Sequence, residues 1–116
     1  MDVSIRDRIL FMANEDYSGL WEVYFETSVI YENLPQTELL RIARKAILEV
    51  MNMGWIQLYR CKEPLTNEKM IPISQNDTLK ALSEDKFWMP PEKDAISIRF
   101  LTTSEGEKAF AGKFLK

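Results

Sequence analysis

The chain has 116 residues with a single cysteine, 46% of its residues are hydrophobic, and its formal net charge is −3. This length suits one ordinary domain with its own core, and the composition excludes a disordered or fibrous protein. No apolar run approaches the roughly 20 residues that a membrane-spanning helix needs. Because a lone Cys61 cannot form an intramolecular disulfide, a reducing compartment is favoured. We therefore expect a single cytoplasmic domain over residues 1–116.

Charge is unevenly distributed along the chain. Residues 1–35 carry two basic and seven acidic side chains, whereas residues 36–60 carry four basic and two acidic ones. The remainder is balanced, with nine of each sign. Affinity for nucleic acid comes from Lys and Arg side chains that meet phosphates, so the acidic total weighs against general nucleic-acid binding. The only local positive excess falls in residues 36–60.

Two helices are predicted in the first third of the chain. The first begins with a capping box at residues 4–7, continues with an apolar stripe, and ends near Asn14. The second is capped by Asp16 or Ser18 and is rich in aromatic residues, so we expect much of it to be buried. Pro35 ends this region, because the residue before a proline is pushed out of the helical conformation.

The clearest predicted element is a helix from about Gln36 to Met53, with Gly54 at the position where a glycine commonly ends a helix. At about 100° per residue, its apolar side chains share one broad face and its basic side chains lie opposite them. The opposite face comprises Thr37, Arg41, Arg44 and Lys45, joined by Leu48 and Asn52. The alternating, β-favouring residues from Trp55 to Arg60 predict a strand directly after the helix.

The last half of the chain is expected to contain a loop, a short helix, a strand and a final helix. Breaker residues predict a loop from Cys61 to Pro72, and a helix start follows near Ser74. Trp88 lies in a bulky apolar anchor before two prolines. Alternation over residues 96–101 predicts a second strand, and residues 102–105 cap the last helix.

The order of these elements resembles that of winged-helix domains. Leu40 to Ile56 resembles their recognition helix running through a glycine into the first wing strand. Phe100 to Phe110 is similar to the last wing strand and following helix of small bacterial transcriptional repressors. The resemblance covers residues 4–112 and implies an α+β, mostly helical fold with a small antiparallel sheet of two or three strands. One departure is that residues 61–95 form an extended wing or insert where repressors usually have a short hairpin.

The resemblance implies that the polar face of the helix at 36–53 enters the major groove of double-stranded DNA, where Arg can read guanine. The remaining contacts would be made with the phosphate backbone from the strand and the wing. The implied base- and phosphate-facing set is Thr37, Arg41, Arg44 and Lys45, and the implied backbone set is Arg60, Lys62 and Lys69. The resemblance therefore predicts a DNA-binding protein of the transcriptional-regulator class.

The alternative is a protein–protein interaction module on the same scaffold, favoured by the acidic charge balance, the modest basic patch and the long insert. Its expected surface is the insert and the exposed aromatic residues, and the basic side chains of the helix are then only the polar face that every soluble helix needs. A continuous positive stripe along the helix at 36–53 favours DNA. Interruption of that stripe by Glu38, Glu49 or the N-terminal acids favours the interaction module. The resemblance also implies a homodimer paired through the terminal helices, for which the first helix and the Phe110–Phe114 segment are the candidates.

Catalytic chemistry has little support in the sequence. Glu22 and Glu26 lie four residues apart, as an acid–base or metal pair can, but the chain has no histidine and a solvated helix edge explains them better. Cys61 would act as a nucleophile or redox sensor only with a lowered pKa and a nearby base, so a structural thiol is the better interpretation. We predict no enzymatic activity, cofactor or metal site, and the sequence indicates no particular small-molecule ligand.

Overall fold

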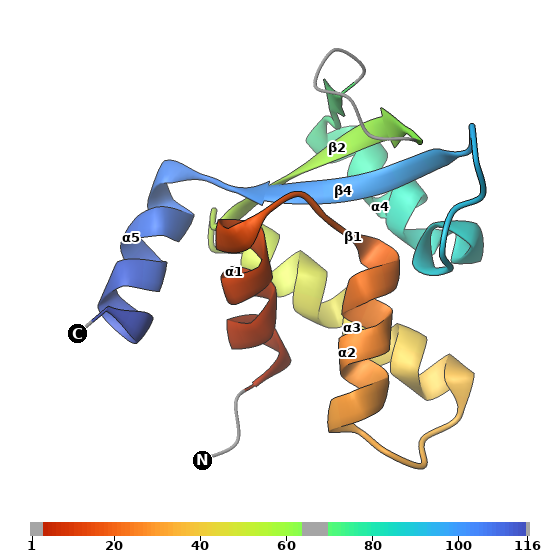
Figure 1. Cartoon of the computed structure of the whole chain (residues 1–116), viewed down its shortest axis with the longest axis horizontal. Coiled ribbons are helices and arrows are strands. Elements are labelled where there is room, and N and C mark those ends of the chain that lie inside the picture. Colours follow the sequence, from red (N-terminus) through yellow and green to blue (C-terminus); the bar gives the residue numbers. More distant parts are fainter. Residues whose placement is uncertain (1–3, 64–69, 116) are drawn as a thin grey trace.

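A computed structural model describes residues 4–63 and 70–115, and over this range the chain is an α+β protein with a helical layer beneath an antiparallel sheet (Figure 1). Lys69, one of the predicted phosphate contacts, lies outside the described residues. The elements in chain order are α1 (Ile5–Glu15), β1 (Ser18–Gly19), α2 (Leu20–Ile30), α3 (Gln36–Asn52), β2 (Ile56–Lys62), β3 (Ile71–Pro72), α4 (Gln75–Ser83), the 3₁₀ helix η2 (Asp85–Trp88), β4 (Ile96–Thr102) and α5 (Ser104–Phe114).

Within the described residues, the sheet has four strands in the order β1-β4-β2-β3, and every neighbouring pair is antiparallel. Its centre is the long pairing of β2 with β4, from Ile56 opposite Thr102 to Lys62 opposite Ile96. The expectation of two or three strands was wrong. The additional strands β1 and β3 have only two residues each, which is too short to produce an alternating pattern in the sequence.

Local capping explains where several helices begin. The Ser4 hydroxyl oxygen accepts from the Asp7 backbone N–H at 3.2 Å, which confirms the predicted start of α1. The prediction that Asp16 or Ser18 caps α2 was wrong, because the N-cap is Gly19. Ser18 is instead part of β1, and its hydroxyl donates to the Met12 carbonyl. Tertiary strand pairing has displaced the local cap.

Helix α3 ends as predicted. Its last helical residue is Asn52, and Gly54 has a φ of 77°, in the left-handed region that favours glycine. The predicted loop starting at Cys61 was wrong at both ends, because β2 continues to Lys62 and β3 occupies Ile71–Pro72.

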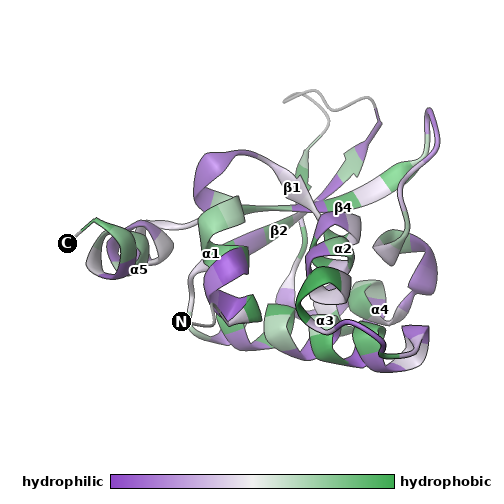
Figure 2. Cartoon of the chain, turned by 60° about the horizontal axis from the view of Figure 1, so that its bottom comes forward, coloured by the Kyte–Doolittle hydropathy of each residue, from purple (hydrophilic) through white to green (hydrophobic). Residues whose placement is uncertain are grey.

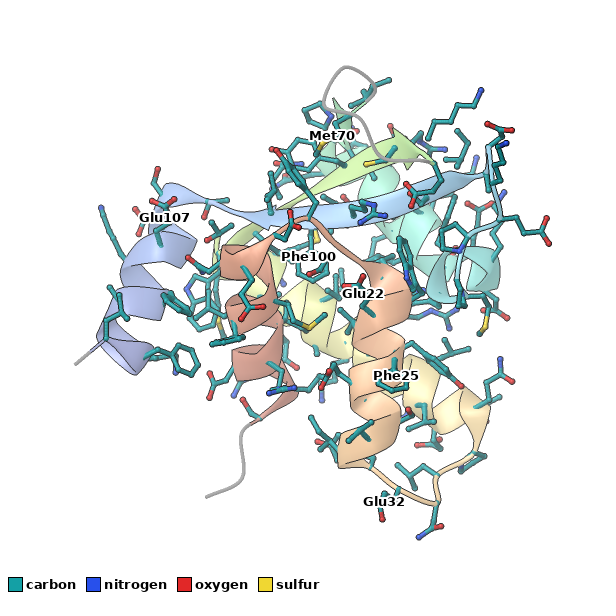
Figure 3. All side chains as sticks on the ribbon, in the orientation of Figure 1. Glu22, Phe25, Glu32, Met70, Phe100 and Glu107 are labelled. Atoms are coloured by element: carbon teal, nitrogen blue, oxygen red, sulfur yellow. The ribbon has the colours of Figure 1, made fainter. Side chains whose placement is uncertain are left out.

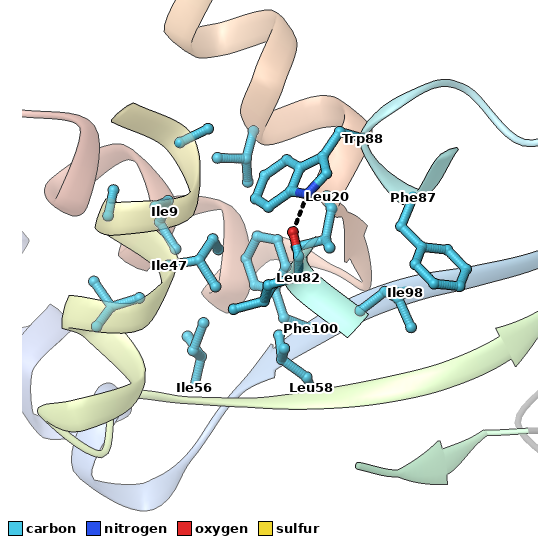
Figure 4. Close-up of a cluster of buried hydrophobic side chains, with 14 of the residues drawn as sticks. Ile9, Leu20, Ile47, Ile56, Leu58, Leu82, Phe87, Trp88, Ile98 and Phe100 are labelled. Atoms are coloured by element: carbon cyan, nitrogen blue, oxygen red, sulfur yellow. Dashed lines mark hydrogen bonds between the residues drawn. The ribbon is translucent and has the colours of Figure 1, made fainter. Parts of the chain in front are cut away.

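One core joins the helical layer, the sheet and the insert. Ile98 and Phe100 of β4 are fully buried, as is Trp88 of the insert (Figure 4). The Trp88 indole Nε1 donates to the Leu82 carbonyl at 2.9 Å, so its one polar atom is satisfied inside the core. The region 61–95 is therefore built into the domain through its second half and is not a separate appendage.

Helix α5 lies at one side of the molecule, next to α1 and away from α2 (Figure 2). It is capped by Thr103, whose hydroxyl oxygen accepts from the Gly106 backbone N–H at 3.0 Å. Gly106 is buried, and a Cβ at this position would collide with the Trp55 carbonyl. Lys113 near the other end forms an ion pair with Asp7 at 3.3 Å.

A pair of glycine substitutions in α5 tests this close approach. We expect Gly106→Ala to lower the free energy of unfolding by about 1–2 kcal/mol, because the backbone carbonyl of Trp55 cannot move aside cheaply. Gly112 has open space around its Cβ position, so Gly112→Ala should raise stability by up to about 1 kcal/mol through helix propensity. Urea unfolding of both variants measures the difference, and equal effects would contradict the packing of α5 against Trp55.

Candidate functional site

The predicted DNA-reading residues of α3 do not all face solvent. Thr37, Arg41 and Lys45 lie together on its exposed side. The Arg41 guanidinium is bonded to the Glu38 carboxylate, with Nη2 and Oε2 at 2.8 Å. This hydrogen bond and the attraction between the charges lower the pKa of Glu38 and raise that of Arg41. The structure therefore brings three of the four predicted residues together, and one of the three, Arg41, already forms an ion pair with Glu38.

Arg44, the fourth of these residues, is turned towards the insert. Its Nε donates to the Leu82 carbonyl at 2.8 Å, and its Nη2 is bonded to the Asp85 carboxylate. Leu82 is in the last turn of α4, where helix carbonyls lack partners within the helix and attract a cation. The periodicity of α3 predicted an exposed position for Arg44. In the structure, its side chain instead joins α3 to the insert.

Acidic side chains interrupt the positive charge on α3. Glu49 pairs with Arg6 of α1 at 3.2 Å, and Glu38 pairs with Arg41. Both carboxylates belong to the same helix as Lys45, so no continuous cationic stripe runs along its exposed side. Interruption of the positive stripe by Glu38 and Glu49 is the arrangement expected for the interaction module and not for DNA binding.

The predicted backbone contacts on β2 belong to a different surface. Arg60 is exposed, and its guanidinium lies 6.0 Å from the Phe87 ring, in a hollow that also contains Asp77 and Glu84 of the insert. Lys62 is exposed at the end of β2, opposite Ile96. The hollow at Arg60 therefore contains both signs of charge, because Lys80 and Lys86 line it together with Asp77 and Glu84.

A further hollow lies elsewhere, between the C-terminal end of α1, the β1 segment and the outer side of α2. We call it the α2 groove. Its volume is about 630 Å³, and four carboxylates line it against one guanidinium, that of Arg99. The four carboxylates are Glu15, Asp16, Glu22 and Glu26. Aromatic side chains form much of the rest of the wall. They are Tyr17, Trp21 and Phe25.

Arg99 forms the inner part of the groove and already has partners. Its Nη1 donates to the Tyr17 carbonyl at 2.7 Å, and its Nη2 is bonded to the Glu63 carboxylate in a largely buried ion pair. The guanidinium lies 4.9 Å from the centre of the Trp21 ring, which is cation–π geometry. The positive charge of Arg99 is therefore directed to Glu63 and not to the carboxylates of the groove.

Glu22 and Glu26, which lie four residues apart in the sequence, differ in their partners. Glu26 forms an ion pair with Arg8 of α1 at 2.7 Å. Within residues 4–63 and 70–115, Glu22 forms no salt bridge, and the same holds for Glu15 and Asp16. Sequence reasoning did not identify this groove, although the −5 balance of residues 1–35 and the aromatic content of α2 were its available signals.

Cys61 is buried on β2, and burial is the main reason that the pKa of its thiol is raised. A raised pKa means less thiolate at a given pH, which is the opposite of what a nucleophilic cysteine requires. The structural interpretation of this residue is therefore the better supported one.

We expect iodoacetamide to alkylate native Cys61 more than about tenfold more slowly at pH 8 than the urea-unfolded chain. Both burial and the raised pKa act in this direction, and the rate should rise as pH increases towards the pKa of the folded state. Mass spectrometry of quenched samples measures the two rates. Equal rates in the two states would contradict the buried position of the thiol.

The terminal helices meet through three phenylalanines. Phe11 of α1 packs against Phe110 and Phe114 of α5, with ring centres 5.8–6.0 Å away. Phe11 and Phe114 remain 38% and 39% exposed, and the neighbouring Leu115 is more exposed still. This leaves an apolar patch along the seam between the two predicted dimer helices.

Comparisons of the chain with protein-family models, with curated proteins and with solved structures gave no match. None of the helices in the described ranges is both long and apolar enough to cross a membrane. Within those ranges, no three His, Cys, Asp or Glu side chains are grouped so that they could hold a metal ion.

Proposed function

We propose that this chain is a protein–protein interaction module built on a winged-helix-like scaffold. The observation that carries the proposal is the position of Arg44, which is bonded to Leu82 and Asp85 of the insert. Without it, the exposed side of α3 presents only Arg41 and Lys45 as cations, accompanied by two paired acids. An interface of this kind offers duplex DNA few phosphate contacts, on which most of the affinity for DNA depends.

The scaffold itself is supported by the order of the elements. Helices α1, α2 and α3, then β2, the insert, β4 and α5 follow the order on which the resemblance to winged-helix domains rests. A fold of this kind does not determine function, which must be argued from its surfaces. The surface that stands out is α2, where Phe25 is 64% exposed and Val29, one turn later, is 52% exposed.

DNA titration tests the proposed function. A fluorescent, mixed-sequence duplex at physiological salt should bind the full chain more weakly than about 10⁻⁴ M, the weak limit of ordinary non-specific binding. The double variant Arg41→Glu with Lys45→Glu should leave the signal unchanged, and circular dichroism verifies that the variant is folded. Tight, salt-sensitive binding that this variant abolishes would overturn the proposal in favour of DNA recognition.

DNA binding by a dimer is the second candidate, favoured by Thr37, Arg41 and Lys45 sharing the exposed side of α3. The exposed Phe11–Phe114 seam supports pairing of two copies through α1 and α5. Sedimentation of Phe114→Asp against the parent protein tests this pairing, and a parent that is monomeric at micromolar concentration would refute it.

A further inference from the structure

Helix α2 presents an apolar surface to solvent that the described chain does not cover. Only Leu20, Val23 and Thr27 of this helix are buried. Phe25 and Val29 are adjacent on its outer side, since residues four apart in a helix are neighbours. Adjacent large apolar side chains that stay exposed commonly mark a binding surface, so this face is suited to covering by a partner.

The charges around this face determine which kind of partner fits. Glu22 shares the outer side of α2 with Phe25 (Figure 3), and Glu15 and Asp16 stand across the groove at the end of α1. None of these three carboxylates has a cation among the described residues, whereas Glu26 has Arg8. The groove is thus acidic as well as apolar, and it repels DNA phosphates and anionic lipids.

The wall of the groove already accommodates one cation. The guanidinium of Arg99 lies over the Trp21 ring on the inner side, and the same wall continues outward to Phe25. Carboxylates next to aromatic faces are the combination that binds guanidinium groups best, through charge-assisted hydrogen bonds and cation–π attraction. A second guanidinium from outside would find carboxylates here that form no salt bridge within residues 4–63 and 70–115.

We propose that the α2 groove binds an arginine-containing, basic segment of a partner protein, whose cation pairs with Glu22, Glu15 or Asp16 while an apolar neighbour covers Phe25 and Val29. This inference rests on the proposed function, since it gives the interaction module its surface and its class of partner. The volume of about 630 Å³ suits a few side chains of a peptide and not a whole folded domain.

Selection from a randomised library of 12-residue peptides on the immobilised full chain tests the proposal. We expect the selected peptides to be enriched in Arg over Asp and Glu. Phe25→Ser should weaken their binding at least about tenfold, as loss of a central aromatic contact does. Glu22→Gln should weaken it about threefold or more and reduce its dependence on salt.

The chain offers a matched control for the main variant. Leu79 of α4 is 65% exposed, compared with 64% for Phe25, so Leu79→Ser removes a similar apolar exposure at a distant position. Its peptide affinity should equal that of the parent. Selected peptides without basic enrichment, or peptides whose binding Phe25→Ser leaves unchanged, would overturn the proposal.

The same experiment separates this proposal from others. If no selected peptide binds at the α2 groove and DNA also fails to bind, the proposed function as an interaction module stands and only its proposed surface is wrong. If DNA binds through α3, the proposed function itself is wrong. A parent protein that dimerises, and that Phe25→Ser converts to a monomer, would assign the groove to a second copy of the chain and overturn the basic partner.

Discussion

Replacing Trp88 by alanine is expected to lower the free energy of unfolding by about 3–5 kcal/mol, the usual cost of removing a large buried aromatic side chain. Trp88 is fully buried and its indole N–H is bonded to the Leu82 carbonyl. The substitution leaves a cavity among α2, α4 and the sheet, and it also removes one donor from that carbonyl. Urea unfolding, followed by circular dichroism, measures the loss.

Leu79→Ala provides the control for Trp88, because it truncates an apolar residue of the same insert that is 65% exposed. Its effect should remain within about 0.5 kcal/mol, as for surface positions in general. A loss of less than about 1 kcal/mol for Trp88→Ala would mean that the insert is an appendage on the core, against the packing described above.

Replacing Arg44 by methionine is expected to lower the free energy of unfolding by about 1.5–3 kcal/mol, the range for hydrogen bonds that involve a charged group. Arg44 bonds the end of α4 through the Leu82 carbonyl and the start of η2 through Asp85. Methionine preserves most of the length of the side chain and much of its packing, so the loss reports mainly on the polar contacts.

Arg41→Met is the matched variant, one turn earlier on the same helix. The ion pair of Arg41 with Glu38 is well exposed, and such pairs contribute little. We expect a change within about 0.5 kcal/mol for this variant. Equal losses for Arg41→Met and Arg44→Met would contradict the assignment of Arg44 to the fold and return it to the exposed face.

Local sequence signals predicted the framework of the fold well. The apolar periodicity of α3 and the glycine after it depend on residues close together in the chain, so Gly54 and the helix end were predictable. The same is true of the Ser4 and Thr103 caps, each of which bonds a backbone N–H three residues later. These features require no knowledge of distant contacts.

The predictions that were wrong have a different physical origin. The strand at Ser18–Gly19 exists because Phe100 and Arg99, about 80 residues later, supply its hydrogen-bonding partners. Arg44 appeared to be a surface cation because helical periodicity places it away from the apolar stripe, yet Leu82 and Asp85 reach it from the insert. Tertiary contacts of this kind override local propensity and leave no trace in a single sequence.

The candidate site was accordingly the least predictable part. A list of basic residues on one helix gives their spacing but not their partners, and the structure assigns acids or carbonyls to Arg41 and Arg44. The α2 groove depends on bringing the end of α1 beside α2 and placing Arg99 against Trp21. Only the acidic balance and the aromatic content of the first third pointed towards it.

An NMR titration of the uniformly ¹⁵N-labelled full chain with two ligands in parallel tests the central claim most directly. The ligands are a mixed-sequence DNA duplex and a basic peptide selected from the library. We expect the peptide to shift the amide signals around Tyr17, Glu22 and Phe25, and DNA to leave the amide signals of Thr37 to Lys45 unchanged at low salt. Salt-sensitive DNA shifts along α3, with an unperturbed α2, would contradict this claim.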